Sequence, residues 1–240
     1  DRLELRRTNA LRDGDHSVCG QEMKGAGIAE CLDALIPHWR QALEECDSFN
    51  AASDTMKRGV GVASCWYGCG NTGLPNPSTV RLGVTPDGRL KLHQGATDIG
   101  QGSNTVITQI CADALGVPVD RFELIGPDTA LTPDCGKTSA SRQTYVTGKA
   151  AEKEGAGLRE KILRFSNRAS DAQIEIDPGS GVIRVVDDQT TLIAVSEMEP
   201  NEHGYCLSAE ETYDPPTVGL DENGQGVPYA VYGYGAQMAV

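Results

Sequence analysis

The spacing of apolar residues along the chain predicts four helices. In the clearest of them Ile28, Leu32, Leu35, Trp39 and Leu43 recur at intervals of three or four residues, as on the buried face of an amphipathic helix. Pro37 lies inside this pattern and is expected to kink the helix or divide it in two. The predicted helices span residues 1–11, 28–46, 103–115 and 145–166.

Between these helices, short apolar runs bounded by turn residues predict β-strands. A hairpin over residues 80–94 turns at Pro86-Asp87-Gly88, a sequence with strong turn chemistry. A second hairpin is expected over residues 174–185. Further strands are predicted at 58–67, 122–125, 192–195, 205–211 and 228–240.

Hairpins that alternate with packed helices favour an α+β fold, built of two-layer α/β sandwich subdomains, over a doubly wound parallel sheet. The expected division has three parts. An N-terminal helical segment covers residues 1–57, a ligand-binding α/β subdomain covers 58–168, and a second, incomplete β-rich subdomain covers 169–240.

A glycine-rich loop connects the strand that ends at Gln94 to the next predicted helix. Gly100 and Gly102 flank Gln101, so the backbone can approach a ligand without a Cβ in the way. Ser103 or Asn104 can cap the helix, whose first-turn N–H groups then face outward. This arrangement suits a phosphate or pyrophosphate, although an ordinary capped loop would have the same sequence.

A second loop, residues 133–144, has the same design, because small and hydroxyl residues lead into a helix. Two helix N-termini brought together could bind one elongated polyanion. Lys137 and Arg142 can neutralise its phosphates, or can be solvated surface charges. The part of this loop nearest the expected helix consists of Thr138, Ser139, Ala140, Ser141, Arg142 and Gln143.

Two familiar nucleotide motifs fail on their context. Residues 68–73 read Gly-x-Gly-x-x-Gly, but Pro75 and Pro77 follow where a dinucleotide fingerprint needs a helix. Gly136-Lys137-Thr138 resembles the end of a P-loop, but position 131, where that motif needs glycine, is leucine.

Composition narrows the classes of partner. The net charge of -13 argues against nucleic acid, and no run of about 18 apolar residues predicts a membrane span. No secretory signal is recognisable, and eight scattered cysteines without Cys-x-x-Cys or zinc-type spacing favour a reducing, cytoplasmic location. No metal ligand set is therefore predicted.

Taken together, the two loops resemble the molybdopterin-binding region of the xanthine oxidase and aldehyde oxidoreductase family of molybdenum hydroxylases, in particular the bacterial aldehyde oxidoreductases. The resemblance is strongest over residues 58–151. It implies that Gly100, Gln101, Gly102, Ser103 and Asn104, with the second-loop residues named above, hold a molybdopterin cofactor in its cytosine dinucleotide form. It also implies an aldehyde or heteroaromatic substrate, whose pocket would include Asn71 and Thr72.

The resemblance further implies partners. Iron–sulfur clusters would lie in other domains or subunits, since this chain lacks their cysteine motifs, and the rest of the molybdenum-binding region would lie elsewhere. The chain is therefore expected to be a piece of a longer protein. The family's catalytic glutamate belongs to a Gly-Glu motif not found here, so no catalytic residue is assigned. A nitrogen-heterocycle hydroxylase and a non-catalytic cofactor-binding fragment remain alternatives.

Overall fold

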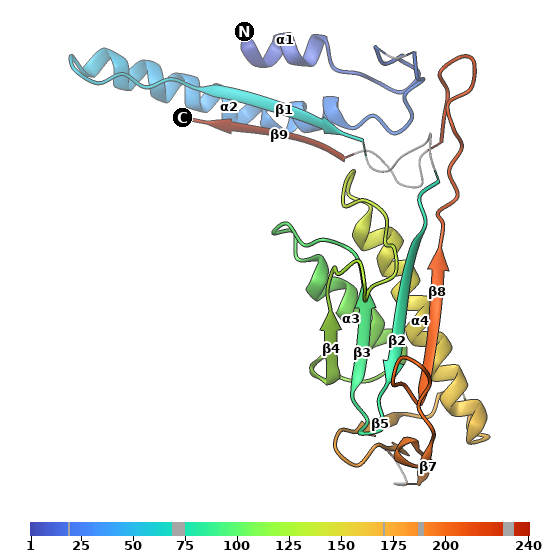
Figure 1. The fold of residues 1–240 in the computed structure, drawn as a ribbon. Coiled ribbons are helices and arrows are strands. Elements are labelled where there is room, and N and C mark those ends of the chain that lie inside the picture. The colour runs from blue at the N-terminus through green and yellow to red at the C-terminus, as the bar shows by residue number, and fades with distance from the viewer. Residues whose placement is uncertain (19, 69–74, 170, 187–189, 228–232) are drawn as a thin grey trace. The chain divides into compact units, whose positions relative to one another are not determined.

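The computed structural model describes residues 1–18, 20–68, 75–169, 171–186, 190–227 and 233–240. The chain forms two compact units, drawn in Figure 1 with the colour running from the N-terminus to the C-terminus. Unit 1 comprises Asp1–Leu74 and Pro216–Val240, and unit 2 comprises Pro75–Pro215. These units differ from the expected division at 57/58 and 168/169, because the C-terminal strand belongs with the N-terminal segment.

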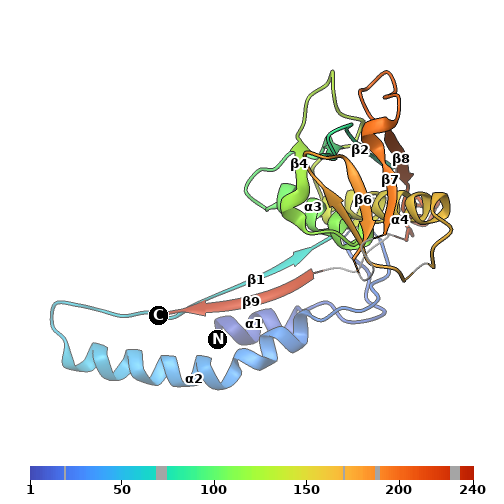
Figure 2. The same cartoon turned by 90° about the horizontal axis from the view of Figure 1, so that it is seen from below.

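Unit 1 is a two-stranded antiparallel sheet packed on two helices, α1 (Arg2–Thr8) and α2 (Ile28–Ala52). Its strands are β1 (Gly61–Tyr67) and β9 (Gly233–Ala239), which pair from Gly61 opposite Ala239 to Tyr67 opposite Gly233. Figure 2 shows the helices lying along the two strands. The helix α2 continues through Pro37, so of the two expected outcomes, a kink or a division into two helices, the division does not occur.

Asp1 connects the two helices of unit 1. Its Oδ1 accepts hydrogen bonds from the N–H groups of Leu3 and Glu4 at 2.6 and 3.0 Å, which confirms it as the N-cap of α1. Its Oδ2 accepts a hydrogen bond from Trp39 Nε1 on α2 at 2.9 Å. The small core between the helices and the strands contains Leu3, Leu32, Trp39, Ala42, Cys46 and Val60.

Unit 2 is built on a four-stranded sheet in the order β4-β3-β2-β8. The strands are β2 (Ser78–Val84), β3 (Leu90–Gln94), β4 (Phe122–Ile125) and β8 (Leu207–Tyr213). β2 runs antiparallel to β3 and β8, whereas β3 and β4 are parallel. A sheet with a single parallel pair confirms the α+β class and excludes a doubly wound sheet.

Two helices, α3 (Ser103–Leu115) and α4 (Gln143–Phe165), lie side by side against one face of this sheet (Figure 1). Gly155 permits their close approach, because a Cβ there would lie 2.5 Å from the carbonyl oxygen of Cys111. The core between helices and sheet includes Val80, Leu82, Leu92, Ile107, Leu115, Leu158 and Ile162.

A second sheet completes the core of unit 2. It contains β5 (Ile174–Asp177), β6 (Val182–Val185) and β7 (Thr191–Ala194), in that order, and confirms the hairpin expected at 174–185. Short 3₁₀ turns occur at Val119–Arg121 and Val195–Glu197. No helix in the described parts of the chain combines the length and the hydropathy that crossing a membrane requires.

Candidate functional site

The two glycine- and hydroxyl-rich loops follow the carboxyl ends of two neighbouring strands in the unit 2 sheet. The first loop, residues 95–102, follows β3, and residues 126–142, which contain the second loop up to the start of α4, follow β4. β3 and β4 are parallel neighbours, with His93 opposite Ile125 at their carboxyl ends. Parallel strands end at a common edge, so the topology itself brings the two loops together. Ligands of α/β sheets commonly bind at this edge.

The loops make direct contact at Thr97 and Thr138. The N–H of Thr97 donates to Thr138 Oγ1 at 3.1 Å, and the same hydroxyl donates to the carbonyl oxygen of Thr97 at 3.2 Å. Nearby, the N–H of Gly95 donates to Cys135 Sγ at 2.9 Å, and that thiol donates to the carbonyl oxygen of Thr79 on β2 at 3.0 Å. The two loops are thus held to each other and to the sheet.

Gly95 must be glycine for this contact. A Cβ at this position would lie 2.7 Å from the carbonyl oxygen of Pro133 in the second loop, a distance that real Cβ atoms almost never adopt. The first loop therefore packs backbone to backbone against the second. Sequence reasoning did not identify Gly95, Thr97 or Cys135 as site residues, because each acts through a partner about 40 positions away.

Asp98 organises the start of α3. Its carboxylate accepts hydrogen bonds from the N–H groups of Gly100 at 2.8 Å and Asn104 at 3.1 Å, and these bonds hold the pKa of Asp98 below its usual range. The N-cap itself is Gly102, with φ +79°, and no side chain bonds the helix end from that position. The expectation that Ser103 or Asn104 caps the helix is wrong, because both already lie within its first turn.

Gln101 folds back on its own loop. Its Oε1 accepts a hydrogen bond from the N–H of Ile99 at 2.6 Å, and its Nε2 donates to the carbonyl oxygen of Thr97 and to Ser103 Oγ, both at 3.1 Å. Asn104 Oδ1 accepts a hydrogen bond from the buried Gln94 side chain at 2.9 Å. These bonds give the first loop a defined shape and leave Gly100 and Gln101 exposed.

Arg142 is a structural residue of the second loop, because its side chain is only 2% exposed. Its guanidinium donates to the carbonyl oxygens of Asn76 at 2.8 Å, Pro77 at 2.9 Å and Lys137 at 3.0 Å, and also to that of Cys135. The expectation that its positive charge faces a ligand phosphate is therefore corrected, since the charge faces the protein's own carbonyl groups. Lys137 is exposed and remains a candidate for that role.

The second loop adopts a rare backbone conformation immediately before α4. Ala140 and Ser141 have φ of +50° and +54°, a left-handed region that costs non-glycine residues on the order of 1–3 kcal/mol each. Gln143 supports the loop from inside: its Nε2 donates to the Lys137 carbonyl and to Thr138 Oγ1, both at 3.2 Å. Ser139 and Ser141 remain exposed at the start of α4.

His93, at the end of β3, is a core residue. Its Nδ1 lies 3.0 Å from the carbonyl oxygen of Leu131, and its Nε2 bonds the hydroxyl of Tyr205. Burial lowers the pKa of His93. Within the described ranges, no group of three or more His, Cys, Asp or Glu side chains is arranged to hold a metal ion. Asn71 and Thr72, the expected substrate-pocket residues, lie outside the described residues.

Comparison with known proteins shows one family whose members resemble this chain in sequence and in structure. The family described as "Molybdopterin cofactor-binding domain" matches residues 34–240. The aldehyde oxidoreductase of Megalodesulfovibrio gigas is 34% identical over 242 residues, which cover 100% of this chain and 24% of that protein. The xanthine dehydrogenase molybdenum-binding subunit of Escherichia coli O157:H7 is 32% identical over 91% of this chain and 31% of its own length.

Solved structures of aldehyde oxidoreductases share the fold of this chain. The aldehyde oxidoreductase from Desulfovibrio desulfuricans ATCC 27774 superposes with a TM-score of 0.67 and 26% identity, over 99% of this chain and 24% of that one. The chain thus spans about a quarter to a third of the length of these three proteins. Since one family model matches most of its residues, and its two loops meet at one edge of the sheet, the chain belongs to the molybdopterin cofactor-binding domain family.

Proposed function

We propose that this chain forms one wall of the molybdenum–pterin site in an enzyme that oxidises aldehydes to carboxylic acids. The observation that carries the proposal is the contact between the two loops, closed by Thr97 and Thr138. An elongated ligand with several phosphate oxygens needs donors from more than one chain segment, and here two segments present them at one edge.

The residues present suit such a ligand. Backbone N–H groups at the start of α4 have no acceptor within the helix, and the helix dipole favours an anion there. The left-handed residues Ala140 and Ser141 come directly before this helix start, and a strained backbone of this kind is typical of ligand-binding loops. In a chain of net charge -13, such local donors replace a broad basic surface.

Each expected contact residue then has a distinct task. Gly100, Gly102 and the exposed face of Gln101 admit the ligand close to the first loop, and Ser103 and Asn104 hold that loop on α3. Thr138, Ser139, Ala140 and Ser141 offer hydroxyl and N–H donors from the second loop. Arg142 and Gln143 hold the second loop in shape, and Lys137 supplies a positive charge.

When bound, the cofactor would supply the two-electron oxidation in which an oxygen derived from water is added to the substrate. We further propose that the pterin carries a cytosine nucleotide and that electrons leave through iron–sulfur domains or subunits outside these residues. We also place the enzyme in the cytoplasm. The catalytic base would lie in the remainder of the enzyme.

An aldehyde substrate is favoured because the aldehyde oxidoreductase of Megalodesulfovibrio gigas matches the whole chain at 34% identity. A purine or another nitrogen heterocycle is the second candidate, because the xanthine dehydrogenase subunit of Escherichia coli O157:H7 matches 91% of the chain at 32% identity. The fold does not separate them, since quinoline 2-oxidoreductase from Pseudomonas putida 86 shares it with a TM-score of 0.59.

The test is chemical analysis of the purified enzyme that contains this chain. Molybdenum is measured by elemental mass spectrometry, and the nucleotide released from the pterin by acid is identified by chromatography. We expect about one molybdenum per chain, release of cytidine monophosphate, and faster turnover of an aldehyde than of a purine. An enzyme without molybdenum or pterin would contradict the proposal, and faster purine turnover would select the second candidate.

The 240-residue chain on its own provides a further test. We expect it to hold little or no molybdenum and to show no turnover. The opposite wall of the site and the catalytic base would come from the remainder of the enzyme. Stoichiometric molybdenum together with aldehyde oxidation by this chain alone would show that the site is complete within it.

A further inference from the structure

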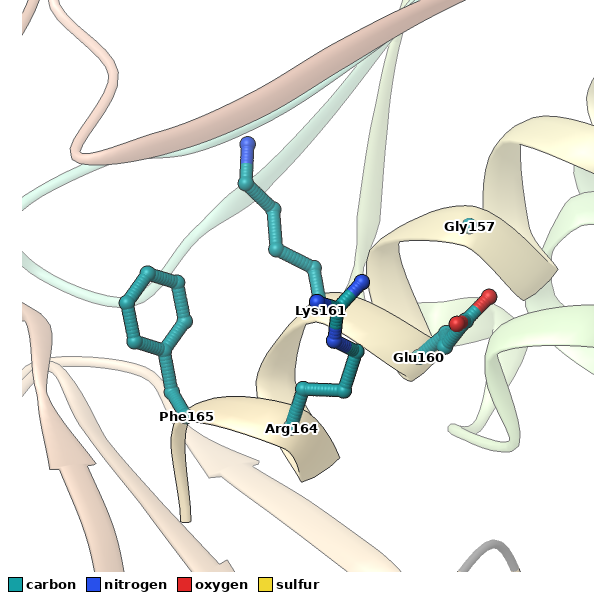
Figure 3. Close-up of a pocket in the computed structure, with 5 residues that line it drawn as sticks. All are labelled: Gly157, Glu160, Lys161, Arg164 and Phe165. Carbon is teal, nitrogen blue, oxygen red and sulfur yellow. The ribbon is translucent and has the colours of Figure 1, made fainter. Parts of the chain in front are cut away.

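The last turns of α4 carry a surface pocket that the proposed cofactor site does not use. It has a volume of about 440 Å³ and is lined by Gly157, Glu160, Lys161, Arg164 and Phe165. Figure 3 shows Lys161 and Phe165 projecting from the same side of the helix, one turn apart.

Packing among the described residues does not explain why position 157, which lines this pocket, is a glycine. Two other glycines of α4 are required by packing: a Cβ at Gly148 would lie 2.8 Å from Ile110 Cδ1, and one at Gly155 would lie 2.5 Å from the Cys111 carbonyl oxygen. A Cβ at Gly157 would meet nothing within 4 Å among the described residues. Glycine weakens a helix interior, and no packing contact within the described part of the chain requires a glycine at position 157.

The walls of the pocket combine an aromatic ring with positive charge. Phe165 is 66% exposed, far more than a phenylalanine that serves only the core of its own unit. The ammonium group of Lys161 donates to the Ser208 carbonyl oxygen at 3.1 Å, which holds it above the helix with donors to spare. Arg164 is also exposed.

The local charge is opposite to that of the chain as a whole. Residues 157–168 contain four Lys or Arg and one Glu, within a chain of net charge -13. One of these cations, Arg159, points inward, where it donates to the carbonyl oxygens of Leu115 at 3.1 Å and Ala172 at 2.6 Å. The others give the end of α4 a cationic surface around an apolar ring, which is complementary to a segment carrying carboxylates beside an apolar side chain.

We propose that this pocket is the docking site for an acidic segment of the rest of the enzyme, outside residues 1–240. The three relatives described above are three to four times as long as the part that this chain matches, so such polypeptide is available in enzymes of this family. The inference rests on the proposed function only in that the chain works within a larger enzyme. It does not depend on how the cofactor is held.

Two other occupants fit less well. A second copy related by a twofold axis would bring the same cationic surface against itself, so like charges would face each other. A nucleic acid would be repelled by the chain's overall negative charge. An acidic polypeptide segment meets the local charge and also covers Phe165.

The direct test is cross-linking of the intact enzyme with a carbodiimide, which joins amines to carboxylates in contact, followed by mass spectrometry. We expect Lys161 to be joined to an Asp or Glu outside residues 1–240. Lys149 is the matched control on the same helix, because it pairs with Glu152 at 2.6 Å and should yield only that local link.

A substitution sharpens the test. Gly157→Leu should leave the thermal unfolding midpoint of the 240-residue chain unchanged or raised, since the new side chain enters open space, yet reduce the Lys161 cross-link in the enzyme at least tenfold. Ala156→Leu, one residue away and lining a different groove, should leave that link intact.

A Lys161 link only to residues 1–240 of the same or a second copy, or no link at all, would overturn the docking site. If the purified enzyme contains no polypeptide beyond residues 1–240, the proposed function within a larger enzyme fails instead. The two failures are therefore distinguishable.

Discussion

Thr97 and Thr138 bind each other twice, through the N–H of Thr97 at 3.1 Å and its carbonyl oxygen at 3.2 Å, with the Thr138 hydroxyl as the partner in both. These residues lie 41 positions apart, on loops that follow neighbouring parallel strands. One hydroxyl thereby links the two loops that follow the carboxyl ends of β3 and β4.

Removing this hydroxyl should separate the two loops. Thr138→Val keeps the shape of the side chain but cannot form either bond, so we expect a loss of about 1 kcal/mol in the free energy of unfolding. We also expect a severalfold fall in molybdenum per chain, measured by elemental analysis of the purified enzyme. Thr212→Val is the control, because it removes a hydroxyl bond of 2.8 Å to Thr79 on the sheet. Equal molybdenum loss in both variants would argue against a role of the loop contact.

We expect Arg142 to contribute mainly to the stability of the folded chain and not to direct binding of a ligand. Arg142→Lys keeps the charge but loses the planar fork that reaches four carbonyl groups, so we expect a loss of about 3 kcal/mol or more in the unfolding free energy. Urea unfolding of the cofactor-free chain measures this. Lys137→Ala should change that stability by less than about 0.5 kcal/mol while lowering molybdenum occupancy of the enzyme. Unchanged stability in Arg142→Lys would restore Arg142 as a phosphate ligand.

Glu154 gives the fold a pH dependence. It is fully buried on α4, and this burial, together with the nearby carboxylates of Glu211 and Glu210, raises its pKa from 4.5 to about 8. Between these pH values the folded chain keeps a proton that the unfolded chain releases. Stability from this group is therefore full below pH 4.5 and falls as the pH rises to about 8, by on the order of 5 kcal/mol.

The substitution Glu154→Gln removes that titration. We expect the unfolding free energy of the variant to change less than that of the parent between pH 5 and pH 8.5, so that the two curves converge or cross as the pH rises. Denaturant titrations at several pH values measure this. Glu152→Gln, at an exposed residue paired with Lys149, should leave the slope unchanged. Parallel curves for Glu154→Gln and the parent would show that Glu154 is ionised in the folded chain.

The elements nearest the site could be predicted from the sequence because their patterns are local. The apolar spacing after Ser103 and the turn residues around Asp87 each depend on neighbours within a few positions, and α3 and the β2–β3 hairpin form as expected. The position of both loops before helices followed from the same patterns. Whether they meet depends on β3 and β4 being parallel neighbours, which no local pattern contains.

The predictions that were wrong depend on contacts that no local sequence pattern contains. The partners of these residues are distant in sequence, or another residue takes the expected capping position. The carbonyl groups of Asn76 and Pro77 lie about 65 positions before Arg142, so its burial was not foreseeable from the loop. Gly102 takes the N-cap position that Ser103 was expected to fill, and the carboxylate of Asp98, five residues before Ser103, fixes the loop there through the N–H groups of Gly100 and Asn104. Likewise β9 pairs with β1 across most of the chain, which changes the division into units.

The most direct measurement of the central claim compares two glycines that differ only in location. Gly102 in the first loop has φ +79°, Gly204 has φ +80°, and a Cβ at either would meet nothing within 4 Å among the described residues. Gly102→Ala and Gly204→Ala should therefore introduce the same backbone strain, about 1–2 kcal/mol.

Molybdenum and pterin content of the intact enzyme should fall about tenfold or more in Gly102→Ala, because the new methyl group occupies space reserved for the ligand. They should stay at the parental level in Gly204→Ala. Full molybdenum occupancy in Gly102→Ala, or an equal loss in both variants, would contradict the assignment of the two loops as the cofactor site.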